Sequence, residues 1–265
     1  MRSTTAIAAL LCCGCATTAP SERVETSAPA VSSQDAARDP DAFALEALDL
    51  CDTRQDLEAR RRGLTMVDAA SAAQPDVAAL QRAAARCGFA VAELERDPDV
   101  IEAAAQRGMD AAQRLGADSD PEAAYLSALC LGLLMRIDMS AAVSRVPEMQ
   151  ARLKIAGARP ELDQGGPLRV LGMLYLRAPP WPASVGDLEL ALELLEQAAQ
   201  RFPAHPQNHL FHAQALLEDD EQGEAATALT RAQEALAQGD WGAAAPRWRQ
   251  EIESLRKRLH EAEGA

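Results

Sequence analysis

The stretch GGPLRVLGMLYLRAPPWPASVGDLELALELLEQAAQRFP, residues 165–203, decides the fold of this chain. Its first and last parts are rich in Leu, Ala, Glu and Gln, which are strong helix formers. Between them, residues 178–186 hold three prolines, a tryptophan and a glycine, which a helix cannot accommodate. The stretch therefore predicts two helices joined by a stiff loop.

A repeat continues from the second of these helices. The series Ala-x₃-Leu-x₂-Ala that begins at Ala191 recurs at Ala225, 34 positions later. This spacing and the residues of the preceding helix resemble the tetratricopeptide repeat, a pair of packed helices with a 34-residue period. That helix supplies Leu168, Leu171, Gly172 and Tyr175. We expect an all-α, tetratricopeptide-like superhelix of helical hairpins, or α-solenoid.

The same reasoning extends along the rest of the chain, where breaks carry Pro, Gly or Asp. In the N-terminal half we expect hairpins but no clean repeat register. Helices are predicted at residues 41–51, 54–73, 76–95, 98–115, 121–137, 142–156, 166–178, 187–202, 206–218, 222–237 and 243–262.

The loop is the main departure from the repeat. Gly172 and Ala191 are 19 positions apart where a regular repeat has 12, so about seven extra residues lie in the turn. Insertions in repeat proteins map to one face of the stack, which is often the binding face.

Charge and motifs restrict the function. The chain has 40 acidic and 26 basic residues, a net charge of −14, so we expect no nucleic-acid partner. It contains no nucleophile elbow, phosphate-binding loop, zinc-protease motif or dinucleotide fingerprint. We therefore expect a protein that is not an enzyme and has no metal or cofactor. An enzyme with an unrecognised site is the alternative.

The N-terminus predicts export. Residues 1–14 combine an Arg with a short apolar run, typical of a signal peptide. The following LCCGCATT resembles the lipobox of bacterial lipoproteins, which implies a lipid anchor on Cys15, with Cys13 as a second candidate. Cys12 stands where that family prefers Leu, and an ordinary secreted protein is the alternative. Residues 15–39 form the lipidated Cys and tether, and residues 40–265 a single helical-repeat domain.

Residues 165–187 carry a second resemblance. This chain resembles the tetratricopeptide-repeat lipoprotein (T) component of TRAP transporters over about residues 120–238. It departs from the family pattern at Gln214, usually Glu, and at Leu133, often Trp. The matching residues are Gly165, Gly166, Pro167, Arg169, Leu171, Gly172, Tyr175, Ala178, Pro179, Trp181, Pro182, Ser184, Gly186 and Asp187.

The resemblance implies a lipid-anchored periplasmic scaffold, with the outer membrane favoured because Ala16 follows the anchor. Its partner would be the periplasmic solute-binding protein, with a small apolar or carboxylated ligand and homo-oligomers as further expectations. An envelope-assembly scaffold without a small-molecule role is the alternative. The candidate binding residues are Arg169, Tyr175, Pro180, Trp181, Asp187 and Asn208.

Two of these residues allow two interpretations each. Trp181 either fills the gap that the insertion leaves between two hairpins, which we favour, or lines a groove or pore as an aromatic anchor. Arg169 either pairs with Asp187 and holds the loop closed, which we favour, or binds a ligand carboxylate.

The cysteines, histidines and tryptophans outside the loop are expected to be structural. We favour Cys51, Cys87 and Cys130 as small buried residues, with a Cys51–Cys87 disulfide between adjacent helices as the alternative. His205, His209 and His212 are expected to pack or hydrogen-bond without binding a metal. Trp241 and Trp248 are expected on one face of the last helix, where they cap the stack.

Overall fold

The computed structural model describes residues 39–263, with the side chains of residues 140, 141, 262 and 263 left aside. Within this range the chain forms eleven α-helices, one 3₁₀-helix and no β-strand. The elements are α2 (Pro40–Leu50), α3 (Leu57–Ala73), α4 (Ala78–Leu94), α5 (Pro98–Arg114), α6 (Pro121–Ile137), α7 (Met139–Ala156), α8 (Gly166–Arg177), α9 (Leu188–Arg201), α10 (Pro206–Glu218), α11 (Gln222–Gln238), η2 (Gly242–Ala244) and α12 (Ala245–Glu263).

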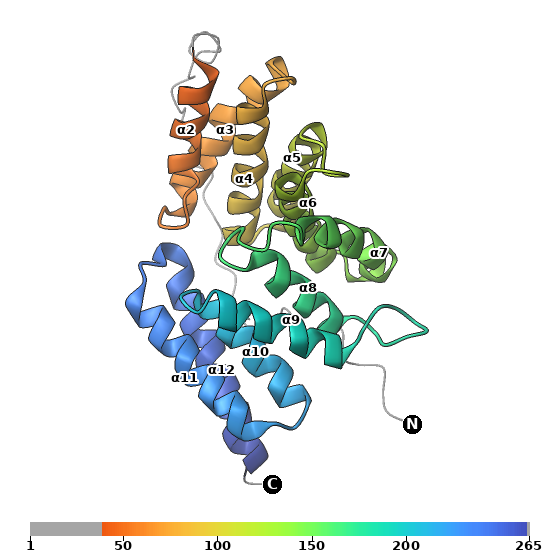
Figure 1. The fold of residues 1–265 in the computed structure, drawn as a ribbon. Helices are drawn as coiled ribbons and strands as arrows, with labels where there is room; N and C mark the ends of the chain where they lie inside the picture. The colour runs from red at the N-terminus through yellow and green to blue at the C-terminus, as the bar shows by residue number, and fades with distance from the viewer. Residues whose placement is uncertain (1–38, 264–265) are drawn as a thin grey trace.

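The helices stack in chain order as a superhelix of hairpins, as Figure 1 shows. Each even-numbered helix packs against the odd-numbered helix that follows it, and α4 and α10 also contact the even-numbered helices on either side. The predicted all-α hairpin superhelix is confirmed, and every helix end lies within three residues of its predicted position. The predicted signal peptide, Cys15 and most of the tether lie outside the described residues.

The repeat register predicted from the sequence is the register of packing. The series that begins at Ala191 and the one that begins at Ala225 are fully buried at all three positions. Gly172 of α8 faces the second helix of its hairpin, where an added Cβ would lie 2.7 Å from the Leu195 side chain. A small residue is therefore required for α8 and α9 to approach this closely.

The stack is less continuous between α7 and α8. The α8 helix packs mainly on α7 and α9, without the extensive contact to α6 that the repeat pattern would give. Here the chain runs through Asp163, Gln164 and Gly165, three consecutive residues with positive φ. This connection therefore reorients the last two hairpins relative to the first three.

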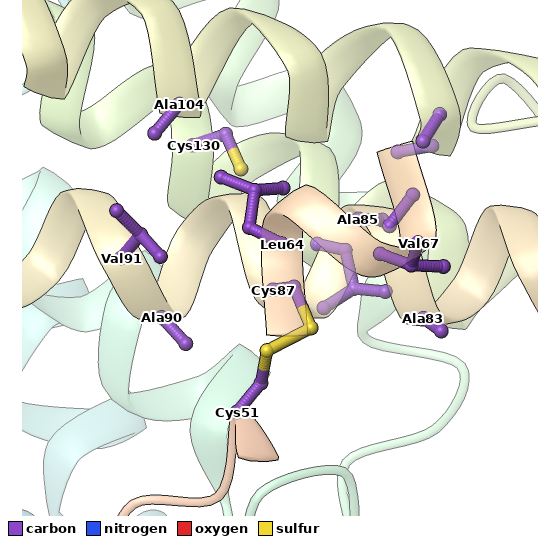
Figure 2. Close-up of a cluster of buried hydrophobic side chains, with 14 of the residues drawn as sticks. Cys51, Leu64, Val67, Ala83, Ala85, Cys87, Ala90, Val91, Ala104 and Cys130 are labelled. Carbon is purple, nitrogen blue, oxygen red and sulfur yellow. A yellow bond between two sulfur atoms is a disulfide. The ribbon is translucent and has the colours of Figure 1, made fainter. Parts of the chain in front are cut away.

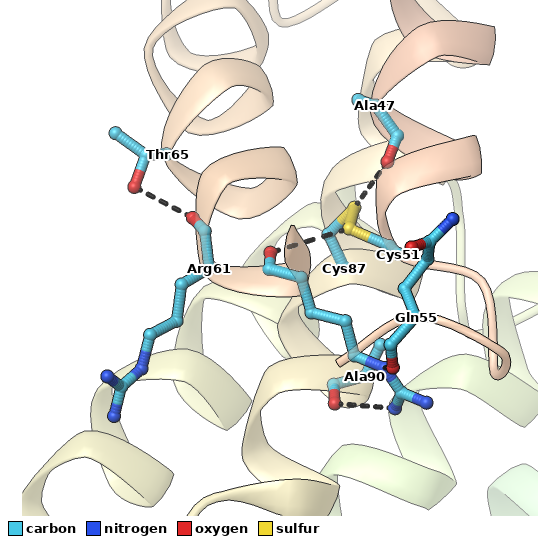
Figure 3. The surroundings of a disulfide bond; sticks show 8 residues. Ala47, Cys51, Gln55, Arg61, Thr65, Cys87 and Ala90 are labelled. Carbon is cyan, nitrogen blue, oxygen red and sulfur yellow. Dashed lines mark hydrogen bonds between the residues drawn. A yellow bond between two sulfur atoms is a disulfide. The ribbon is translucent and has the colours of Figure 1, made fainter. Parts of the chain in front are cut away.

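The N-terminal core contains a correction to the predicted cysteine chemistry. Cys51 at the end of α2 and Cys87 in α4 form a disulfide, shown in Figures 2 and 3. The preferred interpretation of these two residues as free, small apolar side chains was wrong, and the alternative was right. Helical spacing alone left both open, because the sulfur atoms meet only when α2 packs on α4.

The third cysteine behaves as predicted. Cys130 of α6 is free and fully buried in the same core, near Ala104 in Figure 2. Burial raises the pKa of its thiol to about 12, so the thiolate is not populated at neutral pH.

The two ends of the superhelix meet. The curl of the stack brings Gly242 of η2 against Thr53 and Arg54, which lie in the turn between α2 and α3. An added Cβ on Gly242 would lie 2.3 Å from the Arg54 Cα, so only a glycine fits against this turn. The last hairpin thus closes against the first.

Candidate functional site

The Pro-Trp loop, residues 178–187, connects α8 to α9. Helix α8 stops at Arg177 because Ala178 precedes a proline, which disfavours a helical backbone at Ala178. Helix α9 begins where the Asp187 side chain accepts a hydrogen bond from the Leu190 amide at 3.0 Å. Both ends of the loop are therefore set by local sequence.

Backbone hydrogen bonds close the loop at its base. The Gly186 amide donates to the Pro179 carbonyl at 2.8 Å, and the Asp187 amide donates to the Tyr175 carbonyl at 3.0 Å. An added Cβ on Gly186 would lie 2.1 Å from the Ala178 carbonyl oxygen. The close crossing of the two chain segments therefore requires glycine at position 186.

The tip of the loop is solvent-exposed. Pro180, Trp181, Pro182 and Ala183 are all exposed, and the Trp181 side chain is 84% accessible. The preferred interpretation of Trp181 as a plug between hairpins was wrong, because the loop folds outward on its own hydrogen bonds. A large apolar ring that is exposed in this way can serve as an anchor for a binding partner, because most of its surface is free to contact that partner.

Arg169 is the centre of a polar cluster that lies between α6, α8 and α10. Its guanidinium donates to the Asp163 carboxylate at 2.6 Å and to the Asn208 side-chain oxygen at 2.7 Å. The predicted Arg169–Asp187 pair was wrong: Asp187 caps α9 at the far end of α8, while Arg169 lies in its first turn. Arg169 is 3% exposed, so its guanidinium binds groups inside the protein and is not accessible to a ligand in solution.

Asn208 and Tyr125 complete this Arg169 cluster. Asn208 is fully buried and donates to the carbonyls of Gln164 and Phe202 at 2.9 and 2.8 Å. Tyr125 of α6 donates its hydroxyl to Asp163 at 2.9 Å. Burial and the Asp163 charge raise the pKa of Tyr125 well above its usual value. The cluster joins α6, α8 and α10 at the sparse junction of the stack.

Tyr175, another predicted site residue, lies inside the helix stack. Its side chain is buried, and its hydroxyl accepts a hydrogen bond from the Gln150 side chain of α7 at 3.1 Å. Of the six candidate binding residues, the structure places only Pro180 and Trp181 together on an exposed tip, with Asp187 exposed at the loop base.

The histidines have separate packing roles, as predicted. The His205 ring lies 5.0 and 5.4 Å from the rings of Trp241 and Trp248, and burial lowers its pKa to about 3. His209 Nε2 lies 2.8 Å from the Pro203 carbonyl oxygen. Trp241 precedes η2 and is not on the last helix, so the two tryptophans meet through the η2 turn. Among the described residues, no group of three or more His, Cys, Asp or Glu is placed to hold a metal.

Sequence reasoning missed Asp163, the partner of both Arg169 and Tyr125. It is one of 40 acidic residues and lies in a connection outside any helix, so nothing in its neighbourhood distinguishes it. Only the positive-φ path of the chain brings it back over the first turn of α8.

Comparisons with known proteins add no relative: no family model matches this chain, and no curated protein was found to be similar. In residues 39–263, none of the helices has the length and apolar character needed to cross a bilayer.

Proposed function

We propose that this chain is a lipid-anchored periplasmic scaffold that serves as the accessory component of a TRAP-type solute transport system. The resemblance of residues 165–187 to the T component motivates this proposal. The observation that carries it is the 84% exposure of Trp181 at the tip of a hydrogen-bonded loop within that same motif.

The partner in this proposal is the periplasmic solute-binding protein, which docks on the Pro-Trp loop. Trp181 and its flanking prolines provide apolar contact area with little conformational freedom to lose on binding. Arg169 and Asn208 do not contact the loop: their hydrogen bonds join α8, α10 and the α7–α8 connection at the other end of α8. A small apolar or carboxylated ligand, if held, would contact other surfaces of the superhelix.

Binding to purified partner tests the docking. The full chain is immobilised, and the solute-binding protein of the TRAP system encoded in the same genome is passed over it. We expect Trp181→Ala to weaken binding at least about tenfold, as removal of a central aromatic anchor does. The matched control is Leu45→Ala, since Leu45 is also a large exposed apolar residue, 67% accessible, on α2.

Two results contradict the proposal. Equal affinity of wild type and Trp181→Ala would show that the loop is not the docking site. No binding by the wild type, or a genome without a TRAP system, would remove the transport role itself.

The lipid anchor has its own test. We expect the full chain to incorporate labelled palmitate in its native host and to lose the label in Cys15→Ser. An unlabelled wild type would contradict the anchor while leaving the docking experiment interpretable.

A further inference from the structure

A hollow of about 330 Å³ opens between α9, α10 and α11. It lies at the C-terminal end of α9, whereas the Pro-Trp loop precedes the N-terminal end of that helix. Ala199, Pro203 and Ala235 give it small apolar walls. This volume is at the lower end of the range for small-molecule sites.

Two opposite charges lie on the α11 wall of this hollow. Arg231 and Glu234 are exposed and one helical turn apart. Within the described residues, neither makes a hydrogen bond or an ion pair. Arg145 and Glu148 of α7 have the same order and spacing, and they do pair, at 3.5 Å. The Arg231 and Glu234 side chains are therefore not paired with each other, so both charges are available to a ligand.

His209 lies against the same hollow. A carbonyl cannot donate, so the Nε2 atom that lies 2.8 Å from the Pro203 oxygen carries the ring proton. Burial lowers the pKa of His209, Arg231 lowers it further, and Glu234 raises it. The ring is therefore neutral at pH 7, and its Nδ1 is an acceptor. His209, Arg231 and Glu234 all line this hollow.

We infer that this hollow, called here the α9–α11 pocket, binds a free α-amino acid. Side chains one turn apart on a helix have Cβ atoms about 5–6 Å apart. An α-amino acid carries its carboxylate and ammonium on one carbon, so it fits between Arg231 and Glu234 with each charge facing its opposite. The guanidinium donates to the carboxylate, and the ammonium donates to Glu234. This inference does not depend on the transport role.

Calorimetric titration of the full chain with L-alanine tests the pocket. We expect saturable binding by the wild type, weakened at least about tenfold in Arg231→Ala and in Glu234→Ala, because each loses a charge-assisted hydrogen bond. The matched controls are Arg249→Ala and Glu253→Ala, which remove the same charges from exposed positions of α12. We expect both controls to bind like the wild type.

Two alanine derivatives test the class of ligand. N-Acetyl-L-alanine lacks the ammonium, and L-alaninamide lacks the carboxylate, so we expect each to bind at least about tenfold more weakly than L-alanine. Absence of saturable alanine binding by the wild type, or binding by Arg231→Ala or Glu234→Ala as tight as that of the wild type, would overturn the inference. Equal binding of either derivative would overturn the zwitterion assignment.

Discussion

The Arg247 guanidinium lies 2.7 Å from the Glu93 carboxylate, although the two residues are 154 positions apart. Glu93 lies in the last turn of α4 and Arg247 in the first turn of α12, so the pair joins the first part of the superhelix to its last helix. Glu93 also lies 3.8 Å from the buried guanidinium of Arg60. The single negative charge of Glu93 thus faces the positive charges of both Arg60 and Arg247, where the two ends of the stack meet.

Glu93→Gln should loosen this closure. The substitution removes the carboxylate that faces Arg60, which is 1% exposed, and leaves Arg247 with Glu251 at 3.8 Å as its ion-pair partner. We expect a loss of about 1–3 kcal/mol of unfolding free energy in urea and faster amide exchange in residues 242–250. Glu253→Gln, an exposed residue of α12, is the control. A Glu93→Gln protein as stable as this control would show that the pair contributes nothing.

Removal of the Cys51–Cys87 disulfide should destabilise the N-terminal hairpins. The bond closes a loop with a sequence separation of 36. Chain entropy alone predicts a loss of about 4 kcal/mol for a loop of this length. The measurement compares urea unfolding of the oxidised wild type with the Cys51→Ala/Cys87→Ala double variant. In a chain whose Cys12, Cys13 and Cys15 are replaced by Ser, no thiol should react quickly with a disulfide reagent, because Cys130 is buried; a fast-reacting thiol would contradict the assignments of Cys51, Cys87 and Cys130.

Arg169→Met should be among the most destabilising single substitutions. Met keeps the apolar part of the side chain, but it leaves the Asn208 side-chain oxygen without its Arg169 donor and leaves Asp163 with Tyr125 as its side-chain donor. Asn208 is fully buried, and leaving a buried polar group without its partner costs about 1–3 kcal/mol. Arg249→Met, on the exposed face of α12, should change stability by less than about 0.5 kcal/mol. Similar unfolding midpoints for the two variants would contradict the role of the Arg169 cluster.

Acidification should destabilise the fold through His205. Its pKa is about 3 in the folded protein, lowered chiefly by burial and further by Arg169 and His209, against an ordinary value of 6.5. Below pH 6.5 the unfolded chain therefore binds a proton that the folded chain does not. The unfolding free energy then falls as the pH is lowered from 6.5 toward 3. His209 and His212, whose pKa values are also lowered by burial, act in the same direction.

His205→Phe isolates this contribution. Phe keeps a ring between Trp241 and Trp248 and removes the titrating group. We expect a smaller fall in unfolding free energy between pH 6.5 and pH 4 than in the wild type. A variant with the same pH dependence would assign the acid sensitivity to other groups.

The helices and their order could be predicted because the signals are local. Proline after Asp97, Asp120 and His205 begins α5, α6 and α10, and Asp187 caps α9 through its own side chain. The 34-residue recurrence from Ala191 to Ala225 also predicted which helix faces are buried. The helix starts and caps depend on residues a few positions apart, and the recurrence is a repeated local pattern, so both can be recognised from the sequence alone.

The candidate site could be predicted only in part. The sequence located the loop between Ala178 and Asp187, but the preferred placement of Trp181 in the core was wrong. The sequence alone does not distinguish a tryptophan that fills a gap between hairpins from one that is exposed for binding. Whether it is buried depends on the path of the backbone, which here is closed by the hydrogen bond between Gly186 and Pro179.

By itself, the sequence determined an all-α stack of hairpins, its repeat register and the one turn that breaks it. Only the tertiary structure decided that Arg169 bonds to Asn208, that Cys51 bonds to Cys87, and that Glu93 meets Arg247. The physical reason is distance along the chain. Helix formation and capping are governed by neighbours within a few residues, whereas these partners meet only after the superhelix has curled and its helices have packed.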